Sequence, residues 1–510
     1  MDFLAYAGCL GLAGAALLWW YFHVPSSIPR DIPRIPLYVC LLSIWWNLGH
    51  PEVYNRWIRQ PLEKHGAVVV WFTGHWCILV THPDYLTDLF RNDEVYPKIG
   101  INIRAPEGVL GAFSGDNIIN TGHANWGTFT SIMKPGILQR FDLGRIQQKA
   151  SRLTERLLQA QKESGPRTGI LIMPWLARLT QDVMSLCLFG FDLQALDEPR
   201  VPYLQLMGEI IPALFNRWFL YFPVLEKVGK FLPSRRRAFQ KIDEFDRLLD
   251  GIVATTAQAA EKQPKLVSHS LKRALDAGEI SYSQYRSNLR MTFMVGHDNT
   301  EFLLTSAMWE LGRNPMAQDR LRTEVLDATR SNPGLDTLQN LPYLTAVIYE
   351  VLRLYPPVAE MINHTSSRAT LLGGKIPIQP GTNLGWNAYG VHTNPALWGP
   401  DAGVFRPERW GLDLKAIQTH VRRQTMKGHF IAFGLHARKC LGQALGLSEA
   451  KVTLSELVQR IRWTVDPGYQ LQIGGPMLTF PVGLKVIMEE LGSAELQEAA
   501  PLDLPFSIMY

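Results

Sequence analysis

The sequence predicts a mainly α-helical protein with small β-sheets and an N-terminal transmembrane helix. Three observations support this class. Residues 3–22 carry no charge, helical periodicity dominates from about residue 84 onward, and β-branched and aromatic residues concentrate in a few short stretches. With 510 residues, of which 46% are hydrophobic and 19% charged, the chain can bury a large folded core.

The charge-free run "FLAYAGCLGLAGAALLWWYF" opens the chain at residues 3–22. A helix of this length spans a hydrocarbon layer of ~30 Å. A cleaved signal peptide usually begins with a basic segment, whereas Asp2 is acidic, so we assign residues 1–24 to a transmembrane anchor. Arg30 and Arg34 follow the span, and the positive-inside rule therefore places the rest of the chain in the cytosol.

A proline-rich linker, "PSSIPRDIPRIP" at residues 25–36, separates the anchor from a single domain at residues 37–510. Within the domain, residues 67–82 read as two strands around Gly74, residues 363–390 as strand-like and residues 468–488 as a hairpin. Helical periodicity marks residues 146–163, 174–189, 235–262, 284–312, 315–330 and 341–355. A last helix is expected after Cys440.

Composition excludes two broad classes of protein. The net charge is only +5 and the basic residues are dispersed, so no nucleic-acid partner is expected. Five widely separated cysteines do not form a disulfide framework and fit a reducing compartment.

Cys440 stands out among these cysteines because of its surroundings. It lies in the glycine-bearing, basic segment "FGLHARKCLG" (433–442), directly before the last predicted helix. The positive end of a helix dipole and free N–H groups stabilise a thiolate, so we expect a lowered pKa. The residues alone leave three roles open, namely a buried inert thiol, a nucleophile or a metal ligand.

Three further patterns place charged or polar residues within apolar segments. Glu350 and Arg353 in "YEVLRLYPP" share a helix face, and Arg409 in "FRPERW" needs a carboxylate that Glu350 can supply. The segment "VGHDNTEF" (295–302) places a glycine, an acid, an amide and a hydroxyl in the middle of a long apolar helix. Such a composition predicts a local bulge of the helix, of the kind that often marks a functional site.

The chain resembles the cytochrome P-450 family of haem-thiolate monooxygenases. The resemblance rests on four motifs in this order: a long helix with Gly-x-Asp, then Glu-x-x-Arg, Phe-x-Pro-x-Arg-Trp and a Phe…Arg-x-Cys-x-Gly loop. The resemblance covers everything after the linker, so residues 37–510 are expected to form a cytochrome P-450 haem domain. "HANWGTFTSIMKP" (123–135) and "LFGFD" (188–192) fit the same family. The anchor and linker are similar to the microsomal branch, and the overall style to fungal enzymes of secondary metabolism.

The resemblance implies a role for each motif. Cys440 is the iron ligand of haem b, with Phe433 beside the sulfur, while Glu350, Arg353 and Arg409 form a buried structural network. Residues implied at the haem propionates are Trp126, Arg438, His123 and His364. Residues implied at the dioxygen side, where they relay protons, are Asp298, Asn299 and Thr300.

Four positions depart from the family pattern. Asn299 stands where the family usually has threonine, which puts the ordinary proton relay in doubt. His436 replaces a usual glycine, although histidine tolerates a left-handed backbone better than most residues. Thr130 and His364 each stand where a propionate-binding arginine is expected, so the anchoring of the propionates is in doubt as well.

The resemblance also implies partners. Electrons come from an NADPH-dependent flavoprotein reductase, for which the basic run 420–429 is a candidate docking surface, and the substrate is a lipophilic small molecule. The expected location is the endoplasmic reticulum membrane, with a single span. Two alternatives are a haem-thiolate isomerase, dehydratase or coupling enzyme, motivated by Asn299, and a non-enzymatic haem-binding protein. A zinc site at Cys440, His436 and His429 is a variant of the latter.

Overall fold

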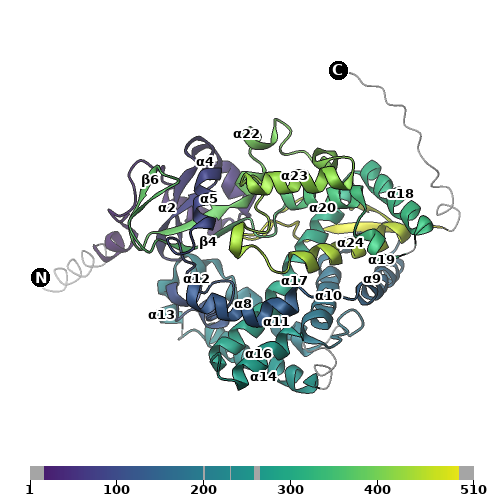
Figure 1. The fold of residues 1–510 in the computed structure, drawn as a ribbon, viewed down its shortest axis with the longest axis horizontal. Helices are drawn as coiled ribbons and strands as arrows, with labels where there is room; N and C mark the ends of the chain where they lie inside the picture. Colours follow the sequence, from purple (N-terminus) through teal and green to yellow (C-terminus); the bar gives the residue numbers. More distant parts are fainter. Residues whose placement is uncertain (1–15, 199–200, 230, 258–264, 333, 493–510) are drawn as a thin grey trace, which may run out of the picture.

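Helices make up most of the fold, and three small β-sheets lie among them (Figure 1). The computed structural model describes residues 16–198, 201–229, 231–257, 265–332 and 334–492, and the side chains of residues 123 and 124 are outside this description. The predicted class, mainly α with small β-sheets, is therefore confirmed for the part of the chain that is described.

The α-helices differ widely in length, and α17 is a 32-residue helix. Their bounds are α2 Leu37–Trp45, α3 His50–Val53, α4 Arg59–His65, α5 Pro83–Arg91, α6 Ile101–Arg104, α7 Val109–Ser114, α8 His123–Ile137, α9 Leu143–Ser164, α10 Met173–Met184, α11 Pro202–Leu214, α12 Arg217–Tyr221, α13 Glu226–Gly229, α14 Pro233–Thr255, α16 Val267–Asp276, α17 Tyr282–Arg313, α18 Pro315–Ser331, α19 Leu335–Leu338, α20 Pro342–Leu354, α21 Ala388–His392, α22 Pro395–Trp398, α23 Leu414–Met426 and α24 Gln443–Arg460. The short 3₁₀ and π segments are η1 Tyr54–Ile58, η2 Ser185–Phe189, η3 Pro223–Leu225, η4 Pro407–Trp410 and η5 His436–Arg438.

The predicted helices correspond to α9, α10 with η2, α14, α17, α18, α20 and α24, with bounds that differ by a few residues. The end of the range expected at 235–262 lies outside the described residues. Local chemistry explains several starts. Ser281 accepts a hydrogen bond from the Gln284 N–H in a capping box before α17, and Pro315 takes the first position of α18.

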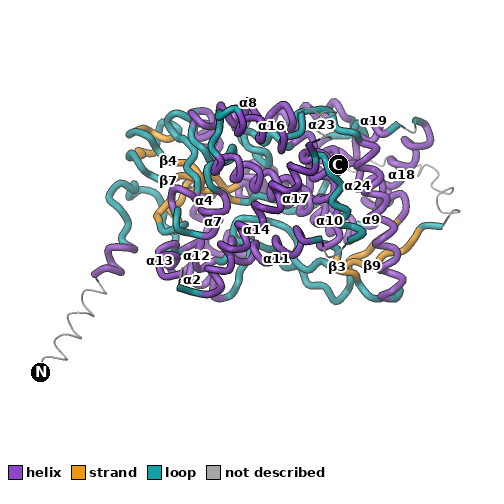
Figure 2. Tube along the Cα trace, turned by 90° about the horizontal axis from the view of Figure 1, so that it is seen from below, coloured by secondary structure: helices purple, strands orange, loops and turns teal. Residues whose placement is uncertain are grey.

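The strands are β1 Ala67–Phe72, β2 His75–Val80, β3 Ile170–Leu171, β4 Glu360–Thr365, β5 Thr370–Leu372, β6 Ile376–Ile378, β7 Asn383–Asn387, β8 Ile461–Val465 and β9 Lys485–Glu490. The sheets have the orders β1-β2-β7-β4, β3-β9-β8 and β5-β6. Figure 2 shows the first two at opposite ends of the helical body. The hairpin expected at 468–488 is confirmed only for residues 472–482, where Ile473 and Pro481 form an antiparallel bridge, whereas β9 pairs with β8.

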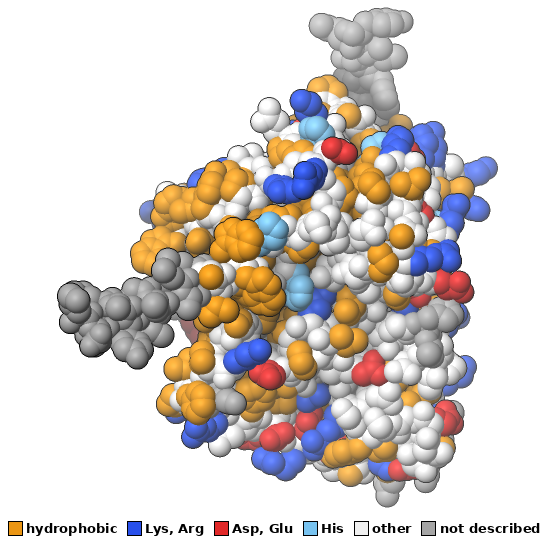
Figure 3. Space-filling model, turned by 90° about the vertical axis from the view of Figure 1, so that its left-hand side faces the viewer, with side chains coloured by type: hydrophobic (Ala, Val, Ile, Leu, Met, Phe, Trp, Pro, Cys, Tyr) orange, Lys and Arg blue, Asp and Glu red, His pale blue; other side chains and the backbone are white. Residues whose placement is uncertain are grey.

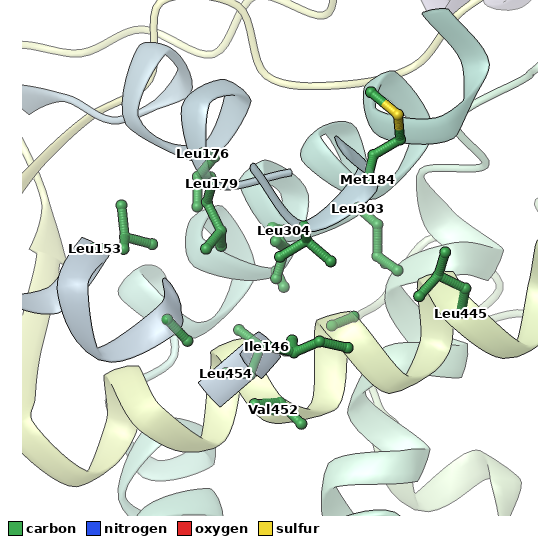
Figure 4. Packing of buried hydrophobic residues seen from close by; sticks show 14 of the residues in the cluster. Ile146, Leu153, Leu176, Leu179, Met184, Leu303, Leu304, Leu445, Val452 and Leu454 are labelled. Atoms are coloured by element: carbon green, nitrogen blue, oxygen red, sulfur yellow. The ribbon is translucent and has the colours of Figure 1, made fainter. Parts of the chain in front are cut away.

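The main hydrophobic core lies where four helices meet. Leucine, isoleucine, valine and methionine side chains of α9, α10, α17 and α24 point toward one another in the close-up of Figure 4. The residues labelled there are Ile146, Leu153, Leu176, Leu179, Met184, Leu303, Leu304, Leu445, Val452 and Leu454. This packing fixes α17 against α24, the helix that follows Cys440.

The bulge predicted at residues 295–302 is wrong, because α17 runs through this segment as regular α-helix. Gly296 is needed for a different reason, which is the packing of α17 against α10. A Cβ at this position would lie 2.7 Å from Cγ of Met184, so the glycine allows α10 to approach α17 closely. The π-helical turn occurs instead at residues 185–189, at the end of α10.

The predicted anchor at residues 3–22 lies mostly outside the described residues. Residues 16–22 are helical, with Trp19 and Trp20 exposed, whereas Tyr21 and Phe22 pack against Trp71 of β1. Among the described helices, none has both the length and the apolar character needed to cross a membrane.

Candidate active site

The loop before α24 holds Cys440 in a tight conformation. Gly434 and His436 have φ values of 69° and 54°, in the left-handed region, so His436 adopts the backbone that glycine usually supplies there. The N–H of Cys440 donates to the carbonyl of Phe433, 2.8 Å away. This closes the loop and presents the sulfur beside the first turn of α24.

Cys440 is accessible to solvent as a residue, although protein surrounds its sulfur. The N–H groups of Gly442 and Gln443, followed by Lys98 and Lys439, favour the thiolate as the sequence predicts. Burial is the larger effect, however, and it raises the pKa of Cys440 rather than lowering it. The expected lowered pKa is therefore wrong for the protein alone. A bound metal deprotonates a coordinating thiol outright, so the raised pKa does not oppose ligation.

Arg438 stands beside Cys440 with part of its hydrogen-bonding capacity unused. Its Nε and Nη2 donate to Asp93 at 3.1 and 3.0 Å, and Nη2 also donates to the carbonyl of Thr121. The guanidinium lies over the ring of Trp126, 4.4 Å from its centroid. Nη1 is buried and has no partner within the described structure. A buried guanidinium N–H left open in this way is a site for an anion.

Two further basic side chains lie near Arg438 and influence one another electrostatically. His364 of β4 forms a bridge with Lys98, and its Nδ1 donates to the carbonyl of Tyr96 at 2.8 Å, while Nε2 is buried and without a partner in the described residues. Burial, together with Lys98, lowers the pKa of His364 to about 3, so the imidazole is neutral. Burial and then Arg438 lower the pKa of Lys98 to about 8, whereas Asp93 and Cys440 act in the opposite direction.

Lys98 and Arg438 therefore form a donor set suited to carboxylates, which fits the two propionates of a haem. The neutral His364, whose Nδ1 already donates to Tyr96, presents only an acceptor at Nε2 and adds no donor to this set. Sequence reasoning missed Lys98, because a lysine in a loop is usually solvated. Nothing in the local sequence, "YPK", distinguishes it from a solvated lysine. His123 begins α8, but its side chain lies outside the described residues. Thr130 is half-buried in the same helix.

Glu350, Arg353 and Arg409 meet behind the loop as the sequence predicts. Nε and Nη2 of Arg353 donate to the two oxygens of Glu350 at 2.8 and 2.7 Å, and Arg409 Nε donates at 3.3 Å. Both Glu350 and Arg353 are fully buried. The indole N–H of Trp410 donates to Glu350 as well, and Asp401 pairs with Arg409; neither residue was predicted. We call Glu350, Arg353, Arg409 and Trp410 the Glu350 network.

On α17, the predicted dioxygen-side residues do not share one face. Asp298 pairs with His297, at 2.8 Å between Oδ1 and Nε2, on the side facing α10. Thr300 is buried on another face, where its Oγ1 lies close to Gly446 of α24. Asn299 is half-buried between them. The acid and the hydroxyl are therefore directed to different neighbours.

Two segments that lie far apart in the sequence come together at the start of β4. Residues 356–363 run beside residues 476–481, with the N–H of Ala359 donating to the carbonyl of Met477 and Val358 bridged to Leu478. Glu360 is not a solvent-facing residue. It is buried, and its Oε2 accepts from Asn387 at 2.9 Å and lies 3.3 Å from His50.

The zinc alternative has no support in the described geometry. His429 contacts Gln424 at 3.0 Å, and His436 is exposed in η5. Among described residues, the cluster of three potential ligands that meets the spacing for a metal ion lies on α17 and does not include Cys440.

Comparisons with known proteins agree with this site. Residues 29–479 match the family model for cytochrome P-450. The chain is 42% identical to the cytochrome P-450 monooxygenase xanG of Aspergillus fumigatus, over 92% of this chain and 89% of that protein. It is 32% identical to cytochrome P-450-DIT2 of Saccharomyces cerevisiae, over 91% of this chain and 94% of that protein. It is also similar, at 27% identity, to cytochrome P-450 734A1 of Arabidopsis thaliana, over 84% of this chain and 80% of that protein.

Proposed function

The chain belongs to the cytochrome P-450 family and is a monooxygenase of that family; from this we propose that it oxidises a lipophilic small molecule in fungal secondary metabolism. Dioxygen is the oxidant, and electrons come from NADPH through a flavoprotein reductase. The observation that carries the proposal is the combination of Cys440, at the start of α24, with the buried Arg438 Nη1 two residues before it, which has no partner within the described structure.

Haem b would be held from two directions. Cys440 would supply the thiolate, and Arg438 and Lys98 would donate to the propionates, with the Arg438 guanidinium held over the ring of Trp126. When bound, a thiolate-ligated haem supplies dioxygen activation, because the thiolate donates electron density that favours O–O cleavage. The Glu350 network keeps the segment of residues 398–410 against α20, since Arg353 donates to the carbonyl of Ala402 and Arg409 to that of Trp398.

Protons reach this chemistry through α17. Asp298 is the acid nearest to Asn299, and its carboxylate can accept and release a proton. An Asn299 amide donates through nitrogen and accepts through oxygen, but it does not pass a proton on in one step. Delivery therefore depends on Asp298 and its neighbours more than on a side-chain hydroxyl.

The reductase would dock on α23 and the adjoining Cys440 loop. This surface carries the exposed basic residues Lys415, Arg422, Arg423, Lys427 and Lys439. Reductase domains that deliver electrons present acidic surfaces, and complementary charge accelerates encounter. Positive charge on this side of the haem site supports the proposed partner.

We also propose a membrane location, with a single N-terminal span in the endoplasmic reticulum and the catalytic domain in the cytosol. Exposed apolar side chains lie on residues 16–22, on α2 and on α12 and α13; they are Leu17, Leu18, Trp19, Trp20, Tyr38, Leu41, Trp45, Trp218 and Val228. Arg217 of α12 donates to the carbonyls of Ser43 and Leu48, so α2 and α12 are neighbours. Figure 3 shows hydrophobic side chains gathered on this side of the molecule. An apolar patch of this kind supports membrane contact beyond the span.

A deletion of residues 3–22 separates these contributions. The haem spectrum is expected to persist, and part of the truncated protein is expected to remain on membranes through the patch formed by α2 and α12. Loss of the haem fold would contradict an anchoring role for the segment, and complete release would contradict the contribution of the patch.

A second candidate function keeps the haem-thiolate fold without net monooxygenation, for example an isomerase, dehydratase or coupling enzyme. Asn299 in place of the usual threonine, with Thr300 turned toward α24, favours this candidate. Consumption of NADPH in proportion to substrate loss distinguishes the two. Metabolite profiling of a deletion strain supplies the substrate, and an accumulated lipophilic precursor would support the first function.

A further inference from the structure

His297 occupies an unusual position on α17. Its side chain is 2% exposed, with Nδ1 2.7 Å from the carbonyl oxygen of Phe293 and Nε2 2.8 Å from Oδ1 of Asp298. Both ring nitrogens therefore face oxygen acceptors. A neutral imidazole has one N–H, so only the doubly protonated imidazolium satisfies both contacts. Burial alone would lower the pKa of His297, but Asp298, Glu301 and the Phe293 carbonyl together raise it.

Gln181 of α10 supports this assignment. Its Nε2 lies 3.2 Å from Nε2 of His297, whereas its Oε1 is buried and has no partner among the described residues. A half-turn of the amide exchanges the two atoms, so that Oε1 accepts from the imidazolium. The same rotation removes a contact between two N–H donors.

Glu301 lies one helical turn after His297 and on the same face. It is 5% exposed, and atoms of His297, Asp298 and Glu301 lie within 4.8 Å of one another. Burial and then Asp298 raise the pKa of Glu301 to about 8, while His297 lowers it, so the carboxyl group is protonated at neutral pH. The buried Tyr203 of α11 completes the group, because its hydroxyl has no partner in the described structure and both acids raise its pKa beyond the effect of burial.

We call Gln181, Tyr203, His297, Asp298 and Glu301 the His297 cluster. Across the described residues, no lysine or arginine forms an ion pair with Asp298 or Glu301. The buried Glu449 of α24 acts electrostatically on Cys187 and does not influence the pKa of His297 or Glu301. A metal ion would require a neutral imidazole, and both nitrogens of His297 already face oxygens. The His297 cluster therefore places two protonated groups, the His297 imidazolium and the Glu301 carboxyl group, beside the Asp298 carboxylate.

We propose that His297 and Glu301 form a buried proton store that supplies Asp298 during turnover, in place of the hydroxyl that Asn299 lacks. The proposal rests on the proposed monooxygenase function. His297 gives the proton on Nε2 to Oδ1 of Asp298, so one N–H bond breaks and one O–H bond forms. The Glu301 carboxyl group then reprotonates His297, solvent reprotonates Glu301, and Asp298 finally releases its proton toward Asn299. In this order Asp298 and Glu301 are never ionised at the same time, which adjacent carboxylates disfavour.

His297 and Glu301 are positioning residues in this scheme, since they act through Asp298. Their variants are Glu301→Gln, Glu301→Asp and His297→Asn. Glu449→Gln is the matched control, because Glu449 is an equally buried glutamate on the neighbouring α24 and its pKa is also raised by burial. Glutamine keeps the shape of glutamate in each case.

The first readout is independent of turnover. Infrared spectra of the full-length haem protein are expected to contain a protonated carboxyl band that Glu301→Gln removes and that disappears as pH rises through about 8. The band removed by Glu449→Gln is expected to persist at that pH, since the pKa of Glu449 lies well above its ordinary value. In His297→Asn the Glu301 band should survive to higher pH, because a positive neighbour is lost. Absence of the Glu301 band at neutral pH would overturn the proposal that Glu301 stores a proton.

The second readout uses NADPH and dioxygen alone, with a recombinant fungal reductase and no added substrate. NADPH oxidation is expected to slow on the order of tenfold in Glu301→Gln and His297→Asn, with a larger solvent isotope effect and partial rescue in Glu301→Asp. Glu449→Gln should retain the wild-type rate. Wild-type rates and isotope effects in both cluster variants would overturn the proposal, while absence of a thiolate-type carbon monoxide spectrum in the wild type would overturn the monooxygenase function instead.

Discussion

The Glu350 network and the His297 cluster are both buried groups of acids and bases, but they differ in how fully their polar atoms are matched. Glu350 accepts from Arg353, Arg409, Trp410 and the N–H of Arg406, and Arg353 donates to backbone carbonyls with its remaining nitrogen. In the His297 cluster, the Tyr203 hydroxyl is buried and has no partner among the described residues.

The difference separates a structural role from a chemical one. A saturated ion network fixes one arrangement and has no donor to spare, so its loss is expected to act on folding. A cluster that contains polar atoms without hydrogen-bond partners, and groups whose pKa values are raised, can change its protonation state at small structural cost. Variants of the two regions should therefore fail in different ways.

The largest expected effect is Glu350→Ala. It strands Arg353 and Arg409 in the core, at a cost of ~3–5 kcal/mol, so little folded haem protein should accumulate. Glu408→Ala is the control, because Glu408 pairs with Arg320 at the surface, where such a pair contributes ~0–1 kcal/mol. The yield of purified protein and its haem content per milligram are measured for both variants. Normal yield and full haem content in Glu350→Ala would contradict the structural role.

A smaller effect is expected for Lys98→Met, which removes a charged donor from the space beside Arg438 but breaks no ion pair of the described protein. Loss of a hydrogen bond to a charged group costs ~1.5–3 kcal/mol, equivalent to roughly tenfold or more in haem affinity. Transfer of haem to an excess of apomyoglobin measures the loss rate. The exposed Lys64→Met serves as control, and equal loss rates in the two variants would exclude Lys98 from the propionate site.

Glu301→Gln is expected to change how stability depends on pH. The pKa of Glu301 is about 8 in the folded protein against an ordinary 4.5, so between these values the folded state holds a proton that the unfolded state has released. Stability of the wild type therefore falls as pH rises through this window. The glutamine variant should match the wild type at the acidic end and exceed it, on the order of a few kcal/mol, near pH 8. Urea unfolding across the window tests this, and parallel pH profiles would show that Glu301 is ionised when folded.

The smallest effect is expected at the surface. Reversing charge with Arg422→Glu and Arg423→Glu should weaken reductase docking roughly tenfold at low salt, without changing the haem spectrum. Arg236→Glu and Arg237→Glu on α14 are the matched control, since these arginines are exposed on the other side of the fold (Figure 1). The KM for reductase, measured at two ionic strengths, tests whether α23 forms the docking surface. Equal effects of the two pairs would remove α23 from the docking surface.

Sequence patterns with fixed spacing predicted the structural parts well. Glu350 and Arg353 are three residues apart on one helix, so their pairing follows from helix geometry. The partner Arg409 followed from the need of a buried guanidinium for a carboxylate. Helix ranges followed from periodicity, with ends set by caps such as Ser281.

The parts that were missed depend on distant contacts. Lys98 approaches Arg438 and Cys440 only because β4 pairs with the loop before α6. The role of Gly296 depends on Met184 of another helix, and the raised pKa of Cys440 depends on burial that no local pattern reports. His297 and Glu301 were visible in "VGHDNTEF", but their face of α17 was not.

The central claim is that Cys440 ligates a haem iron as thiolate, and the carbon monoxide difference spectrum of the reduced full-length protein tests it most directly. The wild type is expected to give the absorption band characteristic of thiolate-ligated haem, and Cys440→Ser to lose that band together with all turnover. Cys187→Ser serves as the control, because Cys187 is packed among the core residues of η2. A wild-type spectrum without the thiolate band, or a Cys440→Ser variant that retains it, would contradict the account.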